Sequence, residues 1–387
     1  MNNKYDLIII GAGVLGAFHA YHALKMGYTV LMVEKDYQPQ EATVRNFGQV
    51  VPSGMNSKWQ AYGRESLKIY KEIQAITDIS IRQNGSVYLA SDEQEEALLD
   101  ELCAINKTND YASIRWSKTE CLTKFSGLRS DYVRSGLYFP DEVTVEPDRM
   151  IHQFLDYLVT SLGLSLVTNQ LVIHCEEVNG QVEVHTAGGT CFLGAKALVC
   201  SGRDFKALFP EIFLNSDLEV SKLQMMKTIS QGKEYSLPGS ILTGWSIRRY
   251  EAFAECPSFA AIKALENENS PQKKWGVHIL FKQAEDGSVI IGDSHQYADA
   301  SSVETLGFDL DMAIDDFMIA EARKIIELPT YEIGQRWWGM YSQCKTSDIF
   351  QKNIGNTIQI LTGIGGKGMT GSAGFSKENI KSILNSK

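Results

Sequence analysis

Three glycines near the N-terminus, Gly11, Gly13 and Gly16, follow a short apolar strand and precede an apolar helix. In a βαβ unit the first glycine takes the tight turn, the second lets the backbone approach a pyrophosphate, and the third lets the helix pack close to the sheet. A second apolar strand, residues 28–34, ends in Glu34, where a carboxylate can accept hydrogen bonds from an adenosine ribose. The pattern predicts a dinucleotide site, and the acidic Glu34 favours FAD or NAD over NADP.

A second glycine-rich segment, residues 363–370, reads Gly-Ile-Gly-Gly-Lys-Gly-Met-Thr and lies between a predicted strand and the last predicted helix. Its backbone amides and the positive end of the helix dipole can face a negative charge. A reduced flavin carries such a charge along the N1–C2=O edge of its ring, whereas a nicotinamide coenzyme needs no such cradle. The segment therefore favours FAD over NAD, with an NAD-dependent dehydrogenase as the alternative.

The composition narrows the class of protein. A hydrophobic content of 44% and a charged content of 22% are typical of soluble globular proteins. The net charge of -10 and the absence of a basic run argue against a nucleic-acid partner. No apolar run approaches the roughly 20 residues that span a membrane, and the first predicted strand starts too early to leave room for a signal peptide. We therefore expect a cytoplasmic protein with no membrane partner.

Cysteines and histidines give no sign of a disulfide framework or a metal site. The seven cysteines are scattered, without a CxxC pair, so we expect free thiols. His19 and His22 stand three residues apart in the first predicted helix, but no third ligand accompanies them. The sequence therefore predicts no metal site.

The predicted fold class is α/β, or α+β overall, with a Rossmann-type FAD-binding domain and a β-rich substrate domain that contains an antiparallel sheet. Dinucleotide-type strands occur at the start, the middle and the end of the chain. At 387 residues the chain suits two domains. We expect a discontinuous FAD-binding domain of residues 1–79, 142–210 and 335–387, and a substrate domain of residues 80–141 and 211–334.

Several stretches of the chain together resemble the D-amino-acid-oxidase-like (DAO) flavoprotein superfamily, which includes glycine oxidase and sarcosine oxidase. The resemblance covers nearly the whole chain and implies an FAD-binding domain of the DAO/glutathione-reductase type. It rests on the N-terminal glycines with Glu34, residues 44–49, residues 197–202 and the closing Gly-Gly-Lys-Gly-Met-Thr. Further stretches more specifically resemble a branch linked with phosphonate catabolism, for which an aminophosphonate substrate has been proposed. These are residues 242–250, 256–259, 292–297 and 336–341.

The resemblance implies FAD contacts from the glycine turn, the end of the second strand, the segment after it, the middle strands and the closing glycine segment. The residues are Gly11, Gly13, Val14, Leu15, Gly16, Glu34, Lys35, Arg45, Asn46, Gly48, Gln49, Val172, Ser201, Gly202, Gly339, Gly365, Gly366, Lys367, Gly368, Met369 and Thr370. Some relatives link the flavin through a cysteine where this chain has Gly339, so we expect non-covalent FAD. Relatives that act on carboxylates often have an arginine and a proline at the turn matching residues 339–341. This chain has neither, which argues against a simple amino-acid substrate.

Amine oxidation by a flavin requires a neutral amine aimed at the flavin N5 and the exclusion of water, so the side chains needed are anion clamps. The first candidate is an arginine on a strand that leads to the flavin, with a tyrosine as hydroxyl partner. The full set is Arg336, Tyr341, His295, Lys367 and Arg249. Residues 218–291 are predicted to be mainly strands, apart from a charged helix and loop at 263–274. Arg248 and Arg249 therefore face opposite ways, and the sequence does not tell which one faces the site.

We therefore expect an FAD-dependent amine oxidoreductase that converts a small, anionic amine to an imine, which water hydrolyses to a carbonyl product. An aminophosphonate is among the substrates considered, and O2 is the default electron acceptor. The alternatives are an amino-acid oxidase or dehydrogenase of the glycine or sarcosine oxidase type, and a non-catalytic FAD-binding subunit. The sequence does not fix the substrate, the acceptor or the oligomeric state.

Overall fold

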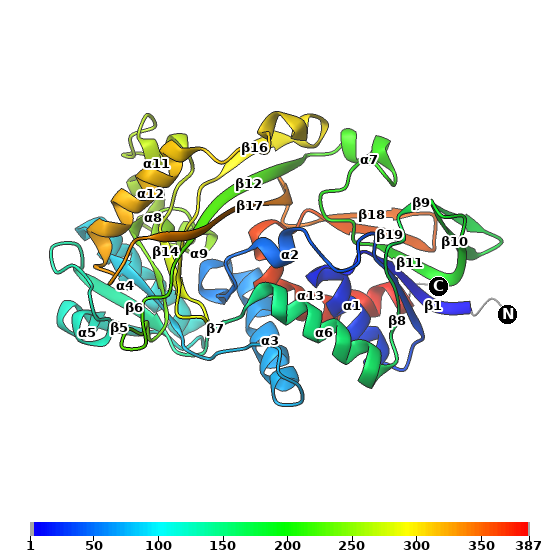
Figure 1. Cartoon of the computed structure of the whole chain (residues 1–387), viewed down its shortest axis with the longest axis horizontal. Helices are drawn as coiled ribbons and strands as arrows, with labels where there is room; N and C mark the ends of the chain where they lie inside the picture. The colour runs from blue at the N-terminus through cyan, green and yellow to red at the C-terminus, as the bar shows by residue number, and fades with distance from the viewer. Residues whose placement is uncertain (1–3, 386–387) are drawn as a thin grey trace.

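A computed structural model of the protein describes residues 4–385. Two large sheets lie toward opposite ends of an elongated molecule, each with helices packed against it (Figure 1). The two longest strands, β12 (Leu218–Thr228) and β17 (Ile333–Cys344), pair with each other and extend toward the middle of the molecule (Figure 1). None of the described helices is long and apolar enough to cross a membrane.

The eight-stranded sheet takes its strands from three separate parts of the chain. Its path is β18-β19-β11-β1-β2-β8, and β9 and β10 add an antiparallel hairpin beside β11. The pairs formed by β1 with β2 and β11, by β2 with β8 and by β11 with β19 are parallel. The strands are β1 (Lys4–Ile10), β2 (Val30–Val33), β8 (Ser165–Val167), β9 (Val172–Val178), β10 (Gln181–Thr186), β11 (Cys191–Val199), β18 (Phe350–Ile354) and β19 (Ile358–Thr362).

Both faces of this sheet are covered, which explains why residues 7–10 of β1 and all of β2 are apolar and buried. Leu7 and Ile9 point to one face and pack against helices, whereas Ile8 and Ile10 point to the other and pack against the hairpin and β19. The covering helices are α1 (Val14–Lys25), α3 (Ser57–Gln74), α6 (Pro147–Leu162) and α13 (Gly368–Asn385). Local sequence fixes their ends: α6, for instance, starts at Pro147 and stops at Gly163, which has φ 78°.

The nine-stranded sheet is antiparallel except where β13 pairs with β4. Its path is β16-β12-β15-β14-β13-β4-β6-β5, with β17 beside β12. The strands besides β12 and β17 are β4 (Ser86–Ala90), β5 (Ile114–Ser117), β6 (Ser135–Phe139), β13 (Ser240–Leu242), β14 (Leu280–Gln283), β15 (Val289–Gly292) and β16 (Gln296–Asp299). Helices α4 (Glu93–Thr108), α5 (Lys118–Lys124) and α12 (Met312–Ile325) complete this half.

The mixed α/β fold class expected from the sequence is confirmed, with parallel strands in one sheet and mainly antiparallel strands in the other. The division into domains remains a prediction. Its boundary at residue 335 falls inside β17, which is hydrogen-bonded to β12 of the nine-stranded sheet. Its outermost residues, 1–3 and 386–387, lie outside the described range.

One predicted segment is wrong: between β13 and residue 263 the chain forms short helices instead of strands, whereas the charged segment 263–274 contains a short helix where a helix and loop were expected. The helices are α8 (Gly244–Ile247), α9 (Glu251–Ala254), α10 (Phe259–Lys263) and α11 (Pro271–Lys274). The cause is tertiary, because Arg248 at the end of α8 pairs with Glu95 and Asp92 and so draws the segment onto α4. Strand β18 was also not predicted, because three consecutive polar residues, 351–353, interrupt the alternation that indicates a strand.

Candidate active site

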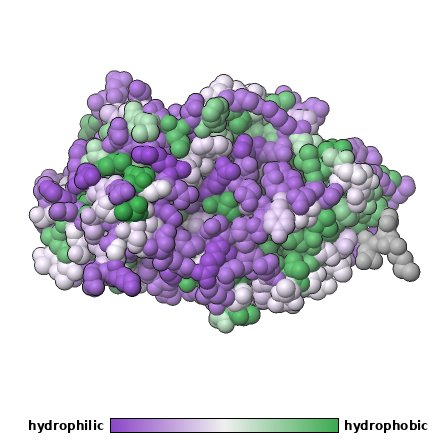
Figure 2. All heavy atoms as spheres, in the orientation of Figure 1, coloured by the Kyte–Doolittle hydropathy of each residue, from purple (hydrophilic) through white to green (hydrophobic). Residues whose placement is uncertain are grey.

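A cavity of about 1010 Å³ opens at the carboxyl ends of β1, β2 and β11 and extends to the nine-stranded sheet. This is the edge of a parallel sheet at which ligands usually bind. On the face shown in Figure 2, mostly hydrophilic side chains gather over the middle of the molecule, between the two sheets. Every residue that the sequence assigned to FAD lines this cavity. Of the five proposed clamp residues, Arg336 is the one that does not line it.

The glycines at the end of β1 are required by backbone contacts. Gly11 has φ +104°, and an added Cβ would overlap the carbonyl oxygen of Cys200. A Cβ on Gly16 would in turn overlap the carbonyl oxygen of Gly11. A Cβ on Gly13 would meet only a side-chain atom, Oγ1 of Thr43, at 3.2 Å. The backbone therefore presents the N-terminus of α1 to the cavity, where its positive dipole end suits a pyrophosphate.

Glu34 holds a buried carboxylate beside this turn. Its Oε2 accepts a hydrogen bond from the Ala12 amide at 2.8 Å, and its Oε1 accepts one from the Asp36 amide at 3.1 Å. Lys35 lines the cavity and is paired with Asp36. Val172 of β9 lines the same end. The acidic group and its neighbours thus lie where the sequence predicts an adenosine ribose.

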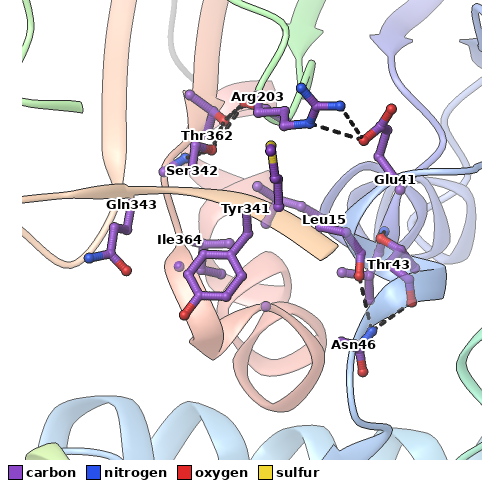
Figure 3. A pocket seen from close by; sticks show the side chains of 18 of the residues that line it. Leu15, Glu41, Thr43, Asn46, Arg203, Tyr341, Ser342, Gln343, Thr362 and Ile364 are labelled. Carbon is purple, nitrogen blue, oxygen red and sulfur yellow. Dashed lines mark hydrogen bonds and ion pairs between the residues drawn. The ribbon is translucent and has the colours of Figure 1, made fainter. Parts of the chain in front are cut away.

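The segment after β2 is held against β17. Its short helix α2 (Ala42–Arg45) ends at Arg45, whose guanidinium lies 5.0 Å from the Trp338 ring centre and whose carbonyl oxygen accepts a hydrogen bond from Trp337. Asn46 donates to the Thr43 carbonyl at 2.6 Å, a contact drawn in Figure 3. Neither tryptophan lines the cavity, so both contribute to packing rather than to its wall. This packing fixes the loop of residues 45–49 at the middle of the cavity.

The closing glycine segment forms the opposite wall. Gly365 has φ +64°, and α13 begins at Gly368, inside the segment that the sequence assigned to a loop. A Cβ on Gly366 would approach only the Tyr341 ring, with the hydroxyl at 3.7 Å, so this backbone is open to the cavity. Tyr341 extends from β17 toward this turn (Figure 3). Lys367 pairs with Glu251 at 2.8 Å and lies 3.7 Å from Asp348, so its charge is already compensated.

Arg249 brings a guanidinium to the far end of the cavity. It donates to the Tyr297 hydroxyl at 2.6 Å, and it lines the cavity together with Tyr341. Its neighbour Arg248 turns away and pairs with Glu95 at 2.8 Å. Burial raises the pKa of Tyr341, which therefore stays protonated and can donate a hydrogen bond. The structure thus settles that Arg249, not Arg248, faces the cavity.

His295 lines the cavity but is not the cation that the sequence suggested. Burial, together with the nearby charge of Arg249, lowers the pKa of His295 to about 3. The imidazole is therefore neutral at physiological pH. Its Nδ1 lies 3.0 Å from the carbonyl oxygen of Gly276 and donates to it.

Arg336, the first candidate clamp, is misplaced by the sequence prediction. Its Nε lies 2.7 Å from Oδ2 of Asp315, a buried carboxylate on α12. Successive side chains of a strand alternate between its faces, and Tyr341 lies five positions after Arg336 on β17, an odd offset. The strand that points Tyr341 into the cavity therefore points Arg336 away from it.

The sequence reasoning missed His278 and Asp293, which also line the cavity. Nε2 of His278 lies 2.7 Å from Oδ1 of Asp293. His278 lies just before β14 and Asp293 just after β15, and these strands pair antiparallel. The signal that could have found the pair is this hairpin, whose open end places the two residues opposite each other.

The family comparison agrees with this geometry. The model of the family described as "DAO: FAD dependent oxidoreductase" matches residues 6–379. The chain belongs to this family. FAD is therefore its cofactor, as the sequence predicted, and the NAD alternative is set aside.

Similar proteins include two kinds of curated oxidase. Glycine oxidase of Bacillus licheniformis is 27% identical over 224 residues, which is 56% of this chain and 58% of the relative. N-methyl-L-tryptophan oxidase of Salmonella newport (strain SL254) is 25% identical over 216 residues, which is 54% of this chain and 56% of the relative. The chain thus matches little more than half the length of these curated relatives. Neither relative supports the more specific resemblance to the branch linked with phosphonate catabolism.

Solved structures of other proteins share the fold over nearly the full chain. Glycine oxidase from Geobacillus kaustophilus has a TM-score of 0.77 at 16% identity, and covers 99% of this chain and 95% of that chain. L-proline dehydrogenase from P. horikoshii has a TM-score of 0.80 at 17% identity, and covers 99% of this chain and 94% of that chain. These likenesses establish the fold.

The residues of this DAO-family chain fit FAD. The backbone at Gly11 and Gly16 has no room for side chains, and the N-terminus of α1 can hold the pyrophosphate. Glu34 can meet the ribose, and the open backbone at Gly366 can meet the flavin ring. A Cβ on Gly339 would lie 3.1 Å from the Arg45 carbonyl oxygen, and the chain offers no cysteine at that position. All seven cysteines are free.

Proposed function

We propose that the protein oxidises a small amine that carries one anionic group, giving an imine that water hydrolyses to a carbonyl compound. Bound FAD supplies the acceptor for the hydride that leaves the carbon next to nitrogen. The observation that carries the proposal is a guanidinium, Arg249, on the wall of the same cavity as the FAD-binding residues. O2 as the final electron acceptor remains part of the proposal.

The residues of the chain have to bind and orient this substrate rather than attack it. Arg249 can donate charge-assisted hydrogen bonds to the anionic group, and the Tyr341 hydroxyl can donate to the same group. Tyr341 also approaches the turn at Gly366, so it joins the anion site to the wall assigned to the flavin. These contacts would hold the C–H bond of the substrate at the flavin face, so that little further motion of the substrate has to be lost at the reaction step.

We propose a phosphonate as the anionic group. A phosphonate has three acceptor oxygens, and it calls for more donors than one bidentate arginine. Arg249 and Tyr341 face the cavity, and the Tyr297 hydroxyl is bonded to Arg249 at 2.6 Å, which gives a guanidinium and two hydroxyls close together. Fewer donor groups are available than the sequence predicted. Arg336 and Lys367 form ion pairs with carboxylates, and His295 is neutral.

An amino-acid oxidase of the glycine oxidase type is the second candidate. Its specific support is the similarity to proteins named glycine oxidase and N-methyl-L-tryptophan oxidase. A carboxylate would occupy the same guanidinium in a bidentate contact. The two candidates differ only in the acid group, so matched substrates separate them.

The test compares matched amines that differ only in the acid group. Aminomethylphosphonate is paired with glycine, and 2-aminoethylphosphonate with β-alanine. Each is mixed anaerobically with the FAD-loaded protein, and bleaching of the flavin band is followed at about 450 nm. Faster bleaching by the phosphonates, with competition by inorganic phosphate, supports the aminophosphonate proposal. Bleaching by the carboxylates alone supports the second candidate. If no amine of a broad panel bleaches the flavin, a non-catalytic FAD-binding subunit is the better description.

A further inference from the structure

Three buried side chains with metal-ligating atoms meet on the wall of the cavity: His278, Asp293 and His295. One ligand atom from each lies within 4.8 Å of the others. The residues are 3%, 6% and 6% exposed, respectively. The loop before β14 carries His278, and the loop between β15 and β16 carries Asp293 and His295. Neither the family nor the proposed function assigns a task to this cluster.

The hydrogen bonds of the histidine rings orient them as in a metal centre. Nδ1 of His295 lies 3.0 Å from the Gly276 carbonyl oxygen, which can only accept, so Nδ1 carries the proton and Nε2 presents a lone pair. Nδ1 of His278 lies 3.0 Å from the Ser246 hydroxyl, while its Nε2 faces Asp293. A metal-binding histidine typically bonds its second ring nitrogen to a carbonyl or another polar group in this way.

The Asp293 carboxylate has one close polar contact, and that contact is poorly aligned. Its Oδ1 is buried and makes no well-formed hydrogen bond, although His278 Nε2 lies only 2.7 Å away. A buried carboxylate oxygen without a well-aligned hydrogen bond is costly. A bound cation would satisfy it.

We propose that His278, Asp293 and His295 bind a divalent transition-metal ion. Two imidazole nitrogens and one carboxylate oxygen suit zinc, ferrous iron or a similar borderline ion. Three protein ligands leave further coordination positions for water or for an anionic group of a substrate in the cavity. The inference does not rest on the proposed function, because metal binding is measured without an amine present.

Two features oppose the ion and sharpen the test. The guanidinium of Arg249 lines the same cavity, so its charge disfavours a cation at this wall. A proton shared by His278 and Asp293 would also account for their 2.7 Å distance, and it is the outcome that would contradict the metal site. Measured occupancy distinguishes the two explanations.

The experiment measures zinc bound to the FAD-loaded protein after chelator treatment and equilibrium dialysis at micromolar free zinc, by mass spectrometry of the metal. Asp293→Asn and His295→Ala remove ligands, and Ser246→Ala removes only the hydroxyl that positions His278. His185→Ala is the control, because His185, with Glu183 and Cys191, forms a partly exposed group with metal-ligating atoms elsewhere on the chain.

We expect one zinc ion per chain in the wild type and in His185→Ala, and its loss in Asp293→Asn and His295→Ala. Ser246→Ala should weaken zinc binding roughly 10- to 100-fold. The flavin absorbance ratio and circular dichroism check that each variant is folded. The proposal is wrong if the wild type binds no zinc or if the two ligand variants bind as much as the wild type. Should these two variants fail to fold, unchanged zinc affinity in Ser246→Ala overturns it.

Discussion

Replacing Arg249 by alanine should weaken substrate binding far more than it slows the chemistry. The guanidinium donates to the Tyr297 hydroxyl and makes no ion pair with a carboxylate among residues 4–385, so it is available to a substrate anion. Loss of one partly buried charged contact costs roughly 2–5 kcal/mol of binding. At 1.4 kcal/mol per factor of ten, the apparent dissociation constant should rise roughly 30- to 4,000-fold.

The assay is anaerobic stopped-flow reduction of the flavin over a range of amine concentrations, which separates the saturation constant from the limiting rate. Two matched controls are available in the chain. Arg248→Ala removes the adjacent arginine, which pairs with Glu95 and Asp92, and Arg336→Ala removes the arginine that pairs with Asp315. Both should leave the saturation constant within a few fold of the wild type. The reasoning is refuted if Arg249→Ala leaves the saturation constant unchanged, or if Arg336→Ala raises it as much.

Three further outcomes are expected. Gly13→Val should give folded but colourless protein, because the added side chain meets the Thr43 side chain and not the backbone. Gly16→Val should lose both the flavin and the circular dichroism of the folded protein, because its side chain would overlap the Gly11 carbonyl oxygen. Flavin content and circular dichroism of the two variants check this. Because Gly339 stands where a linking cysteine would be, acid precipitation should release all the flavin into the supernatant, and colour left on the pellet would contradict this. Burial raises the pKa of Glu142 from its ordinary 4.5 to about 7. The free energy of unfolding should therefore fall by about 3 kcal/mol as the pH rises from 4.5 to 7. Denaturant titrations of Glu142→Gln over the same pH range should show no such fall.

The Glu142 variant is a clean test because its surroundings suit an amide. Oε1 accepts hydrogen bonds from the Ser53 amide and the Tyr111 hydroxyl, each at 2.8 Å, and Oε2 is bonded to Ser86. A glutamine can keep its oxygen toward the first two groups and donate from its nitrogen to the Ser86 hydroxyl. An unchanged pH dependence in the variant would show that another group is responsible.

The dinucleotide end of the cavity was predictable because its determinants are local. Gly11, Gly13, Gly16 and Glu34 belong to consecutive elements, and the spacing of types along the chain is enough to place them. The closing segment was predictable for a similar reason, since Gly366 and its neighbours sit between one strand and one helix. Only the start of α13 at Gly368 differs, because glycine lowers helix propensity without preventing a helix.

The substrate end depended on distant contacts, and the prediction was weaker there. Side chains alternate along a strand, so Arg336 and Tyr341 face opposite ways. The sequence alone therefore excludes that both side chains face the cavity. That Arg249 faces the cavity could not be read from the chain, because acidic residues on α4 decide where Arg248 goes. The low pKa of His295 likewise depends on burial by segments far away in sequence.

The last part of the chain lies at the centre of the molecule. Strand β19 pairs with β11 inside the first sheet, and α13 packs against α1 and α3 while contributing Thr370 to the cavity. During synthesis on the ribosome, the N-terminal glycine turn therefore emerges long before the wall that faces it. Because a ligand stabilises only the state that binds it, FAD stabilises the fold only after α13 has docked. We therefore expect FAD to bind only after α13 has packed against α1 and α3.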